Sequence, residues 1–369
     1  MRNSYFSMLV STALALVLLT TGCGSRSASK SMAPDSEPFQ ALDQRELDGW
    51  QGALDGDILV ARNKSGLTVT DLAANKPLAS IPVKQDVGFD ISGNYLVWSD
   101  LRNEETPIGE LGSYDVANAD VFLYDLSTGE ERQLTTDPSA QINPKISGNY
   151  VVWMDNASDA AKDYPSDWQL VLFNVKTGEQ KTITTGKGGH TNPDIDAGKV
   201  VWENGSRVTD RGLRAGENVP ENNTDISLYS IDTGVTVSIA AEDYKEARPQ
   251  ISGNIVTWEV FNGSYSGDIF VHDLATGETD QLTHLKENQR TPVVSGHIVA
   301  WMDERNGSST HDVGPGPHNS DIYMADLEKG TERLVTGEGP QIDPLISDHW
   351  IVYGKSSDVE AKLTAVRYQ

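Results

Sequence analysis

Short runs in which β-branched or aromatic residues alternate with polar ones recur along most of the chain. This period-two pattern is typical of β-strands with one buried face. One phrase shows it clearly, reading ISGNYLVWSD from Ile91 and ISGNYVVWMD from Ile146. In both, two alternating runs flank the letters SGN, where Gly or Asn supplies the positive φ of a tight turn. The phrase therefore predicts an antiparallel hairpin.

The hairpin phrase occurs in five clear and two weaker copies. The clear copies begin at Ile91, Ile146, Ile195, Ile251 and Val294, and the weaker ones at Leu54 and Ile346. The clear copies end on tryptophans and the last copy on a tyrosine, spaced by 43 to 56 residues: Trp98, Trp153, Trp202, Trp258, Trp301 and Tyr353. A proline opens the first strand of most units.

A second hairpin follows each copy after a loop of variable length. Its best example is DVFLYDLSTGE, Asp120 to Glu130, in which the turn glycine needs the left-handed backbone region. Asn75 takes this glycine's place in the first copy, and asparagine is the best substitute there. Each unit is thus predicted to be a four-stranded antiparallel meander of about 50 residues.

An isolated meander cannot bury both of its faces, whereas several arranged radially can. The predicted fold is an all-β β-propeller of four-stranded antiparallel blades. Seven blades are favoured, and six is the alternative, in which the first and last partial copies share one blade. The last copy stops after its third strand, and FQALDQRE from Phe39 is predicted to supply the missing outer strand. The repeated tryptophans are expected to pack between blades.

The start of the chain carries export signals. Arg2 precedes an apolar run, Met8 to Leu19, which is too short to span a bilayer comfortably. The letters LLTTGCGS follow and resemble a bacterial lipobox, although Thr20 stands where that motif usually carries Leu. Cys23 is the only cysteine. The alternative is a secretory signal with an unmodified cysteine.

These signals divide the chain into three parts. Residues 1–22 are predicted to be a lipoprotein signal peptide, 23–38 the lipidated Cys23 with a flexible tether, and 39–369 the propeller. Two acyl chains on Cys23 anchor a protein stably to a membrane. The expected location is the outer face of the cytoplasmic membrane, the periplasm or the outer membrane.

The net charge of the chain limits the classes of partner that it is expected to bind. It has 29 Lys and Arg against 54 Asp and Glu, a formal net charge of −25. Nucleic acid is not an expected partner, because phosphate neutralisation needs clustered basic residues. The surface is expected to be soluble and self-repelling, and the protein a monomer.

Two stretches carry a family resemblance. NPKISGNYVVW, Asn143 to Trp153, and DVFLYDLSTGEERQLT, Asp120 to Thr135, resemble the TolB-like propeller repeats of bacterial periplasmic and of bacterial and archaeal surface proteins. The resemblance implies a propeller in the cell envelope. Members are mostly recognition platforms, and a few relatives are polysaccharide lyases, so no single activity is implied. Tol proteins also carry a separate N-terminal domain, and the expected organisation of this sequence, a tethered propeller, departs from that pattern, so the resemblance does not imply a Tol-system role.

Antiparallel order sorts the connections onto two faces. The SGN and TGE turns share one face, here called the bottom face. The loops between strands two and three, and those between blades, share the opposite top face. Three top loops are long: Ser99 to Asp120, Asn204 to Asp225 and Asp303 to Asp321. Long loops on a rigid scaffold usually carry binding sites, so the top face is the expected working face.

The inter-blade loops before each proline are predicted to meet at the central mouth of the top face. Polar residues stand three and one positions before the prolines, and nine are predicted to bind a ligand: Gln141, Asn143, His190, Asn192, Glu246, Arg248, Gln289, Gln341 and Asp343. The functional interpretation is a polar funnel for a small ligand, ion or sugar. In the structural interpretation they cap strand ends and solvate a water-filled channel.

Acidic residues also gather at strand ends. They are Asp100, Asp155, Glu203, Glu259, Asp303, Asp120, Asp225, Asp268 and Asp321. Clustered carboxylates with backbone carbonyls can hold calcium, but aspartates at loop ends also cap turns. The loop from His311 to Asp321 is a weaker candidate for a transition metal. No cofactor is expected, with calcium the one ion kept open.

Catalytic signatures are missing: there is no G-x-S-x-G, no H-E-x-x-H and no P-loop. No residue is therefore assigned a catalytic role. The predicted function is a cell-envelope lipoprotein whose propeller binds a protein or carbohydrate through its top face. The alternative is an extracellular polysaccharide-degrading lyase or hydrolase with its site at the central mouth.

Overall fold

The part of the chain that the structure describes is built from strands. This computed structural model describes residues 32–35, 37, 39–84, 86–103, 118–156, 168–185, 189–205, 224–241, 244–261, 267–306, 320–336, 340–355 and 362–368. These ranges contain no helix, and therefore none long and apolar enough to cross a bilayer. The all-β class is confirmed.

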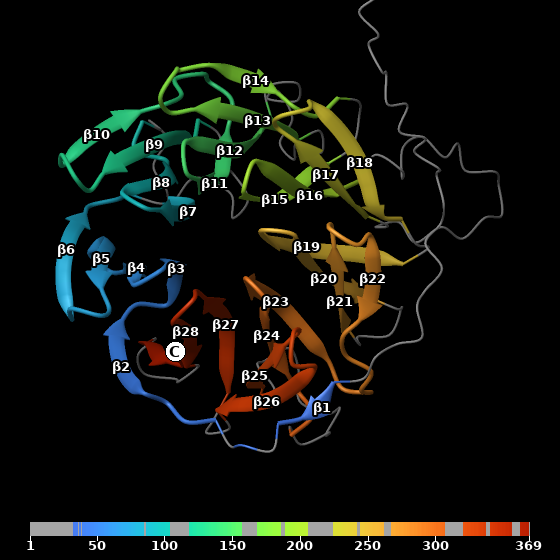
Figure 1. The fold of residues 1–369 in the computed structure, drawn as a ribbon. Coiled ribbons are helices and arrows are strands. Elements are labelled where there is room, and N and C mark those ends of the chain that lie inside the picture. Colours follow the sequence, from blue (N-terminus) through green and yellow to red (C-terminus); the bar gives the residue numbers. More distant parts are fainter. Residues whose placement is uncertain are drawn as a thin grey trace, which may run out of the picture.

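The described strands form seven sheets arranged as blades around an axis (Figure 1). In each blade the first strand lies nearest the axis and the outer strand lies at the rim. The seven-bladed propeller is confirmed, and the six-bladed alternative is wrong because every partial copy has a blade of its own.

The first four blades are meanders of four consecutive strands. Blade 1 contains β3 (Gln51–Asp55), β4 (Ile58–Asn63), β5 (Gly66–Asp71) and β6 (Lys76–Ile81). Blade 2 contains β7 (Asp86–Ser92), β8 (Tyr95–Asp100), β9 (Asp120–Asp125) and β10 (Glu130–Gln133). Blade 3 contains β11 (Gln141–Ser147), β12 (Tyr150–Asp155), β13 (Gln169–Asn174) and β14 (Gln180–Thr182). Blade 4 contains β15 (His190–Asp196), β16 (Lys199–Asn204), β17 (Asp225–Ser230) and β18 (Val235–Ala240).

The last three blades include both ends of the described chain. Blade 5 contains β19 (Lys245–Ser252), β20 (Ile255–Phe261), β21 (Gly267–Asp273) and β22 (Glu278–Gln281). Blade 6 contains β23 (Gln289–Ser295), β24 (Ile298–Asp303), β25 (Asp321–Asp326) and β26 (Thr331–Thr336), with β1 (Ala33–Pro34) added outside. Blade 7 contains β27 (Gln341–Ile346), β28 (Trp350–Lys355), β29 (Lys362–Arg367) and, outermost, β2 (Asp43–Asp48).

Blade 7 closes the ring by joining the two ends of the chain. Strand β2 pairs antiparallel with β29, from Asp43 opposite Arg367 to Asp48 opposite Lys362. The predicted outer strand from the segment near Phe39 is therefore confirmed. Strand β1, by contrast, lies within residues that the sequence assigned to a flexible tether, and the sequence did not predict it.

The repeated tryptophans fill the spaces between neighbouring blades. Five of them are at most 2% exposed: Trp98, Trp153, Trp202, Trp258 and Trp301. Trp153 packs in one cluster with Val97 of blade 2 and Val171 of blade 3. Trp98 stacks on Phe122 with 5.7 Å between ring centroids. The predicted core role is confirmed, and these rings are too buried to stack on a ligand.

The bottom turns join every blade to the next one. The backbone N–H of Gly93 in blade 2 donates to Asp55 of blade 1 at 2.6 Å. Similar hydrogen bonds cross the other junctions: Gly148 N to Ser92, Ser147 to Asp196, Gly253 N to Asp196, Gly296 N to Ser252, Ser295 to Asp348, and Ser347 to the Gly56 carbonyl. The Ser and Asp side chains of these turns thus fix the ring from below.

Candidate functional site

The innermost strands of blades 3 to 7 carry a bulge near their top end. In β11 the ladder to β12 shifts between Ile142 and Lys145, and β15, β19, β23 and β27 shift at the equivalent place. The prolines lie inside these bulges, so the prediction that they open the strands is wrong. The bulge tolerates them because its residues leave the ladder.

The residue before each proline has a left-handed backbone. Its φ lies between 50° and 53° at all five positions: Asn143, Asn192, Arg248, Thr291 and Asp343. This conformation is uncommon outside glycine and is an outlier for the β-branched Thr291. Such strain persists only where the surroundings hold it, and it concentrates at functional sites.

The five bulge residues line a cavity of about 580 Å³ at the top end of the axis. Its volume lies within the range typical of small-ligand pockets, about 300–1,000 Å³. The cavity has a polar wall formed by Asn143, Asn192, Arg248, Lys145 and Gln250. Blades 6, 7 and 1 add the apolar Val293, Leu345, Leu363, Pro344 and Trp50, together with the polar Thr291 and Asp343. The mouth is therefore amphipathic in cross-section.

Trp50 is the aromatic residue of this mouth. It lies between β2 and β3, on the chain's passage from the rim to the axis, and is 43% exposed. Its backbone N–H donates to the Arg62 carbonyl at 3.0 Å, and the Arg62 guanidinium lies 5.9 Å from its ring centroid. Trp50 thus offers a partly open ring held from one side, unlike the five core tryptophans.

Arg248 is held in the mouth by two glutamates. Its Nη1 donates to Glu259 at 2.7 Å, and its backbone N–H donates to Glu203 at 2.7 Å. Glu259 is fully buried, whereas the Arg248 side chain is 50% exposed. Burial raises the pKa of Glu259, and Arg248 acts against that rise. One end of the guanidinium is fixed, and its exposed part faces the mouth.

Two more bulge residues complete the polar rim. The Asn192 side chain donates to Glu203 at 2.7 Å, so Glu203 braces both Asn192 and Arg248. Burial raises the pKa of Asp343, and the nearby positive charge of Arg248 lowers it in part. The rim of the mouth therefore carries the guanidinium of Arg248, the amide of Asn192 and the carboxyl of Asp343, whose pKa is raised.

The structure brings four of the nine predicted ligand residues to the cavity wall: Asn143, Asn192, Arg248 and Asp343. The other five are at most 3% exposed and do not line it: Gln141, His190, Glu246, Gln289 and Gln341. They belong to the ladder before the bulge, where Gln141 pairs opposite Asp155. The extra bulge residues break the two-residue alternation of the strand. Residues before the bulge are therefore buried, whereas residues within it line the cavity. Ligand binding by all nine stays a prediction.

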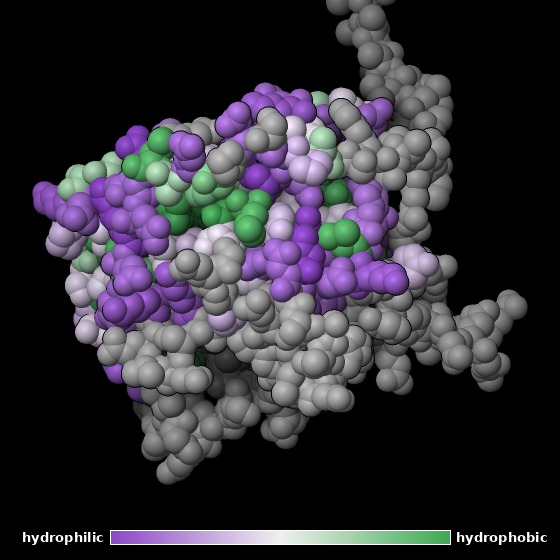
Figure 2. All heavy atoms as spheres, turned by 90° about the horizontal axis from the view of Figure 1, so that it is seen from below, coloured by the Kyte–Doolittle hydropathy of each residue, from purple (hydrophilic) through white to green (hydrophobic). Residues whose placement is uncertain are grey.

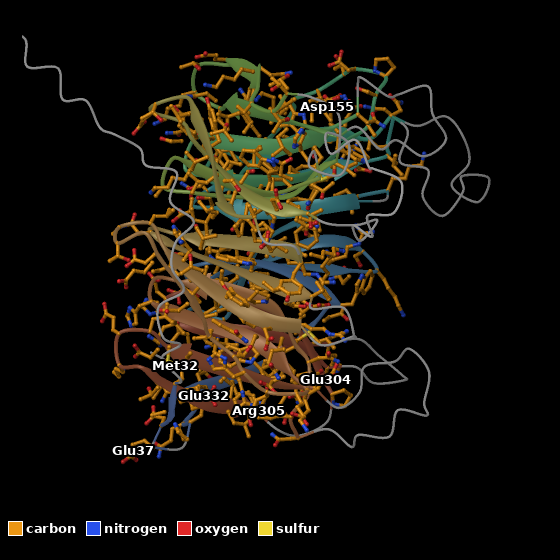
Figure 3. All side chains as sticks on the ribbon, turned by 90° about the vertical axis from the view of Figure 1, so that its right-hand side faces the viewer. Met32, Glu37, Asp155, Glu304, Arg305 and Glu332 are labelled. Carbon is orange, nitrogen blue, oxygen red and sulfur yellow. The ribbon has the colours of Figure 1, made fainter. Side chains whose placement is uncertain are left out.

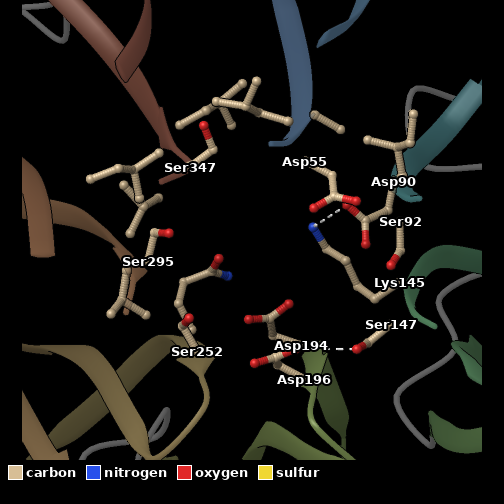
Figure 4. A pocket seen from close by; sticks show the side chains of 18 of the residues that line it. Asp55, Asp90, Ser92, Lys145, Ser147, Asp194, Asp196, Ser252, Ser295 and Ser347 are labelled. Atoms are coloured by element: carbon tan, nitrogen blue, oxygen red, sulfur yellow. Dashed lines mark hydrogen bonds and ion pairs between the residues drawn. The ribbon is translucent and has the colours of Figure 1, made fainter. Parts of the chain in front are cut away.

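A second, smaller chamber of about 280 Å³ continues the channel toward the bottom face. It shares Gly52, Lys145, Gln250, Val293 and Leu345 with the mouth cavity. Figure 4 looks into this chamber, where Lys145 reaches toward Asp90 and serines follow the wall. The channel is therefore continuous along the axis.

Lys145 lies between two aspartates from the neighbouring blades. Its Nζ is 4.0 Å from Asp90. Burial lowers the pKa of Lys145, but the negative charges of Asp90 and Asp194 together outweigh burial, so the pKa is raised overall. Burial also raises the pKa of Asp194, to about 6, against the lowering effect of Lys145. Asp194 accepts the Ile251 N–H at 2.8 Å. The lysine is thus held as a cation under the mouth.

The acids proposed for calcium are bound to protein groups where the structure describes them. Asp303 pairs with Arg305 at 2.6 Å, Asp100 with Arg102 at 2.9 Å, and Asp321 accepts Asn306 at 2.8 Å. Among the described residues, no group of three or more His, Cys, Asp and Glu side chains is placed to hold a metal. Calcium binding stays a prediction. His311, Asp312 and His318, and most of the three long top loops, lie outside the described residues.

Sequence reasoning missed Trp50, Lys145, Asp90 and Asp194. Each aspartate and Lys145 precedes the isoleucine of its hairpin phrase, so their shared repeat position was a usable signal. Trp50 has no counterpart in the other repeats, and only its position just before the first copy marked it. These residues come together only because the ring closes, and the sequence does not show which blades then face one another.

Comparisons with known proteins identify solved structures of the same fold but no family for this chain. No family model matches the chain, and no curated protein does. An oligogalacturonate lyase solved with manganese is similar at TM-score 0.58 and 14% identity, covering 94% of this chain and 99% of the lyase. An acylaminoacyl peptidase of Pyrococcus horikoshii is similar at TM-score 0.56 and 14% identity, over 85% of this chain. This chain spans about half, 51%, of that peptidase.

TolB from Acinetobacter baumannii also matches, at TM-score 0.45 and 12% identity, over 86% of this chain and 78% of TolB. At these identities the similarities to the lyase and the peptidase establish a shared propeller fold and nothing finer.

Proposed function

We propose that this chain is a cell-envelope lipoprotein whose propeller binds carbohydrate through the mouth of its central channel. The observation that carries the proposal is Trp50, partly exposed on the wall of a cavity of about 580 Å³. Across the cavity stand the amides of Asn143 and Asn192 and the guanidinium of Arg248. An open aromatic ring facing planar polar groups suits a sugar.

The two walls match the two kinds of surface on a sugar ring. The C–H faces of a pyranose are apolar and pack on an aromatic or aliphatic wall, here Trp50 and Leu345. Its hydroxyls donate and accept hydrogen bonds, which amide, guanidinium and carboxyl groups satisfy. The strained, braced bulges hold these polar groups in place before the ligand arrives, which lowers the entropy cost of binding.

A protein ligand is the other partner predicted from the sequence. Such a partner needs a broad surface, about 800 Å² on each side. The long top loops that would offer it lie largely outside the described residues. The described mouth is small and concave, and it therefore favours carbohydrate.

A glycan array with the mature protein, followed by titration of the best oligosaccharide, tests the proposal. The decisive variant is Trp50→Ala. Leu42→Ala is the matched control, because Leu42 is also exposed, at 66%, and does not line the mouth. We expect binding that Trp50→Ala weakens and Leu42→Ala leaves unchanged. Binding that survives Trp50→Ala, or no binding to any glycan, contradicts the proposal.

A second candidate function makes the same mouth catalytic, as a lyase or hydrolase acting on extracellular polysaccharide. Arg248 favours it, since an exposed guanidinium can pair with the carboxylate of a uronate sugar. Lys145 is a poor base for such a reaction because Asp90 and Asp194 hold it protonated. An absorbance assay for unsaturated product from uronate polysaccharides separates the two functions, and turnover lost in Arg248→Ala establishes the enzyme.

The anchor is part of the proposal. A diacylated Cys23 would hold the propeller at the outer face of the cytoplasmic membrane or at the outer membrane. Mass spectrometry of the mature N-terminus tests this directly. We expect a chain that begins at Cys23 and carries the added mass of acyl groups; an unmodified thiol contradicts it.

A further inference from the structure

The N-terminal segment binds the rim of the propeller before it joins the ring. Strand β1 pairs in parallel with β26, the outer strand of blade 6, with Ala33 opposite Thr331. The Ala33 N–H donates to the Gly330 carbonyl at 3.0 Å, and the Asp35 N–H to the Glu332 carbonyl at 2.8 Å. We call residues 32–35 the strap.

Side chains reinforce the strap at both ends. Met32 packs against the core between blades 5 and 6, which includes Leu282 and Val299. Asp35 lies 3.7 Å from the Arg333 guanidinium. Beyond the strap, Phe39 packs against the core of blades 6 and 7. The chain is therefore tied to the propeller from Met32 onward.

The direction of β1 determines where the preceding chain leaves the propeller. Strand β26 starts just after the bottom turn at Gly330, and β1 runs parallel to it. Met32 is therefore at the bottom end of the rim. Figure 3 shows Met32 and Glu37 toward the side of the blades opposite Glu304, which follows the top end of β24. The link from Met32 to residue 31 is therefore made at the bottom end of the rim.

The reach of that upstream chain is short. Met32 is nine positions after Cys23, and a fully extended chain of that length spans about 30 Å. To turn the top face toward a membrane, the chain must first climb the blade, about 20 Å for a six-residue strand. Little length then remains to clear the top loops. A lipid on Cys23 is therefore most easily accommodated with the bottom face nearest the bilayer.

We propose that the bottom face is the membrane-facing surface of this protein, and that the mouth on the top face points away from the bilayer. This inference rests on the lipid anchor of the proposed function. The surface itself does not insert. The bottom turns expose carboxylates such as Glu130, Glu179 and Glu328. Figure 2 views the ring from its edge, where hydrophilic residues surround separate hydrophobic patches among the coloured atoms.

The orientation has a functional consequence for the proposed mouth. A mouth turned away from the lipid remains open to long glycans of the envelope. A mouth turned toward the lipid would admit only what fits between the ring and the headgroups. The strap thus orients the binding site through its pairing with β26.

Fluorescence quenching by lipid headgroups tests the inference on the full lipoprotein in liposomes. Acylation consumes the thiol of the only cysteine, so one engineered cysteine gives a unique label. Two positions on blade 5 form a matched pair, both exposed: Thr276→Cys on the bottom turn between β21 and β22, and Lys286→Cys on the top loop before β23. We expect quenching from nitroxide-headgroup lipids to be several-fold stronger for Thr276→Cys. Equal or reversed quenching overturns the inference.

Two further variants separate the strap from the anchor. Ala33→Pro removes the N–H that donates to the Gly330 carbonyl, which should release the strap and lengthen the free tether. The difference in quenching between the Thr276→Cys and Lys286→Cys labels should then become smaller. A contrast that stays unchanged contradicts the orienting role of the strap. Flotation with liposomes reports on the anchor alone, with Cys23→Ser as the non-floating control. A wild type that fails to float contradicts the anchor and the orientation together, whereas one that floats with equal quenching contradicts the orientation alone.

Discussion

Replacing Arg248 with alanine tests the ion pair that braces the mouth. The change removes the donor that lies 2.7 Å from Glu259 and leaves a fully buried carboxylate without its cation. Losing one partner of a fully buried pair costs about 3–5 kcal/mol. The Arg248 side chain is half exposed, so solvent screens the pair, and we expect a loss of about 2 kcal/mol.

Arg248→Gly separates the lost charge from the backbone strain. Both variants lose the guanidinium, but only glycine adopts the observed φ of 53° without steric cost. An L-residue in this region costs about 1–2 kcal/mol, part of which the greater freedom of an unfolded glycine cancels. We therefore expect Arg248→Gly to be more stable than Arg248→Ala by up to about 1 kcal/mol.

The pH dependence of the alanine variant has a definite sign. Burial raises the pKa of Glu259, and losing Arg248 removes a group that lowers it. A carboxyl with a raised folded-state pKa binds more protons folded than unfolded, so its contribution is present at low pH and is lost as pH rises. The deficit of Arg248→Ala is thus largest at neutral pH and shrinks toward the raised pKa of Glu259.

Urea unfolding followed by tryptophan fluorescence measures all three effects, at neutral and at mildly acidic pH. An Arg248→Ala protein as stable as wild type at neutral pH would refute the bracing role of the ion pair. A glycine variant clearly less stable than the alanine variant would refute the strain argument. Circular dichroism of both variants checks that the β-structure is retained.

Three further predictions concern the channel and the core. Trp50→Ala should weaken oligosaccharide binding about tenfold, equivalent to about 1.4 kcal/mol, without lowering the melting temperature, as isothermal titration and calorimetry can show. Asp194 has a pKa raised to about 6, so its contribution to stability is present below its ordinary value of 3.8 and lost as pH rises through about 6. In Asp194→Asn, the melting temperature should therefore change less with pH between about 3.8 and about 6 than in the wild type. An unchanged pH dependence would mean that other groups cause it. Trp153→Ala should cost about 3–5 kcal/mol in urea unfolding because its ring fills the space between two blades; a loss below 1 kcal/mol would contradict the core role.

The repeat made most of the fold predictable. The letters around Gly93 and Trp98 specify a turn and a buried strand in every copy, because the turn needs positive φ and the strand needs one apolar face. Asn75, with φ of 53°, adopts the left-handed turn conformation expected of glycine there. Ring closure by β2 was predictable because the last copy lacked one strand.

The site was only partly predictable. Gln141 and Asn143 are two residues apart and would share a face in a regular strand. Gln141 stays in the ladder and is buried, whereas Asn143 lies in the bulge and lines the channel. The pairing of Lys145 with Asp90 depends on the distance between two blades, which periodicity does not specify. Trp50 has no repeat partner, so only the closed ring shows that it lines the same cavity as Arg248.

A crystal structure of the propeller with its best-binding oligosaccharide is the most direct test of where the ligand binds. The account predicts a sugar ring packed on Trp50, with hydroxyls bonded to Asn143, Asn192 or Arg248. Sugar density on the outer rim or at the bottom turns, with the mouth holding solvent, would contradict it.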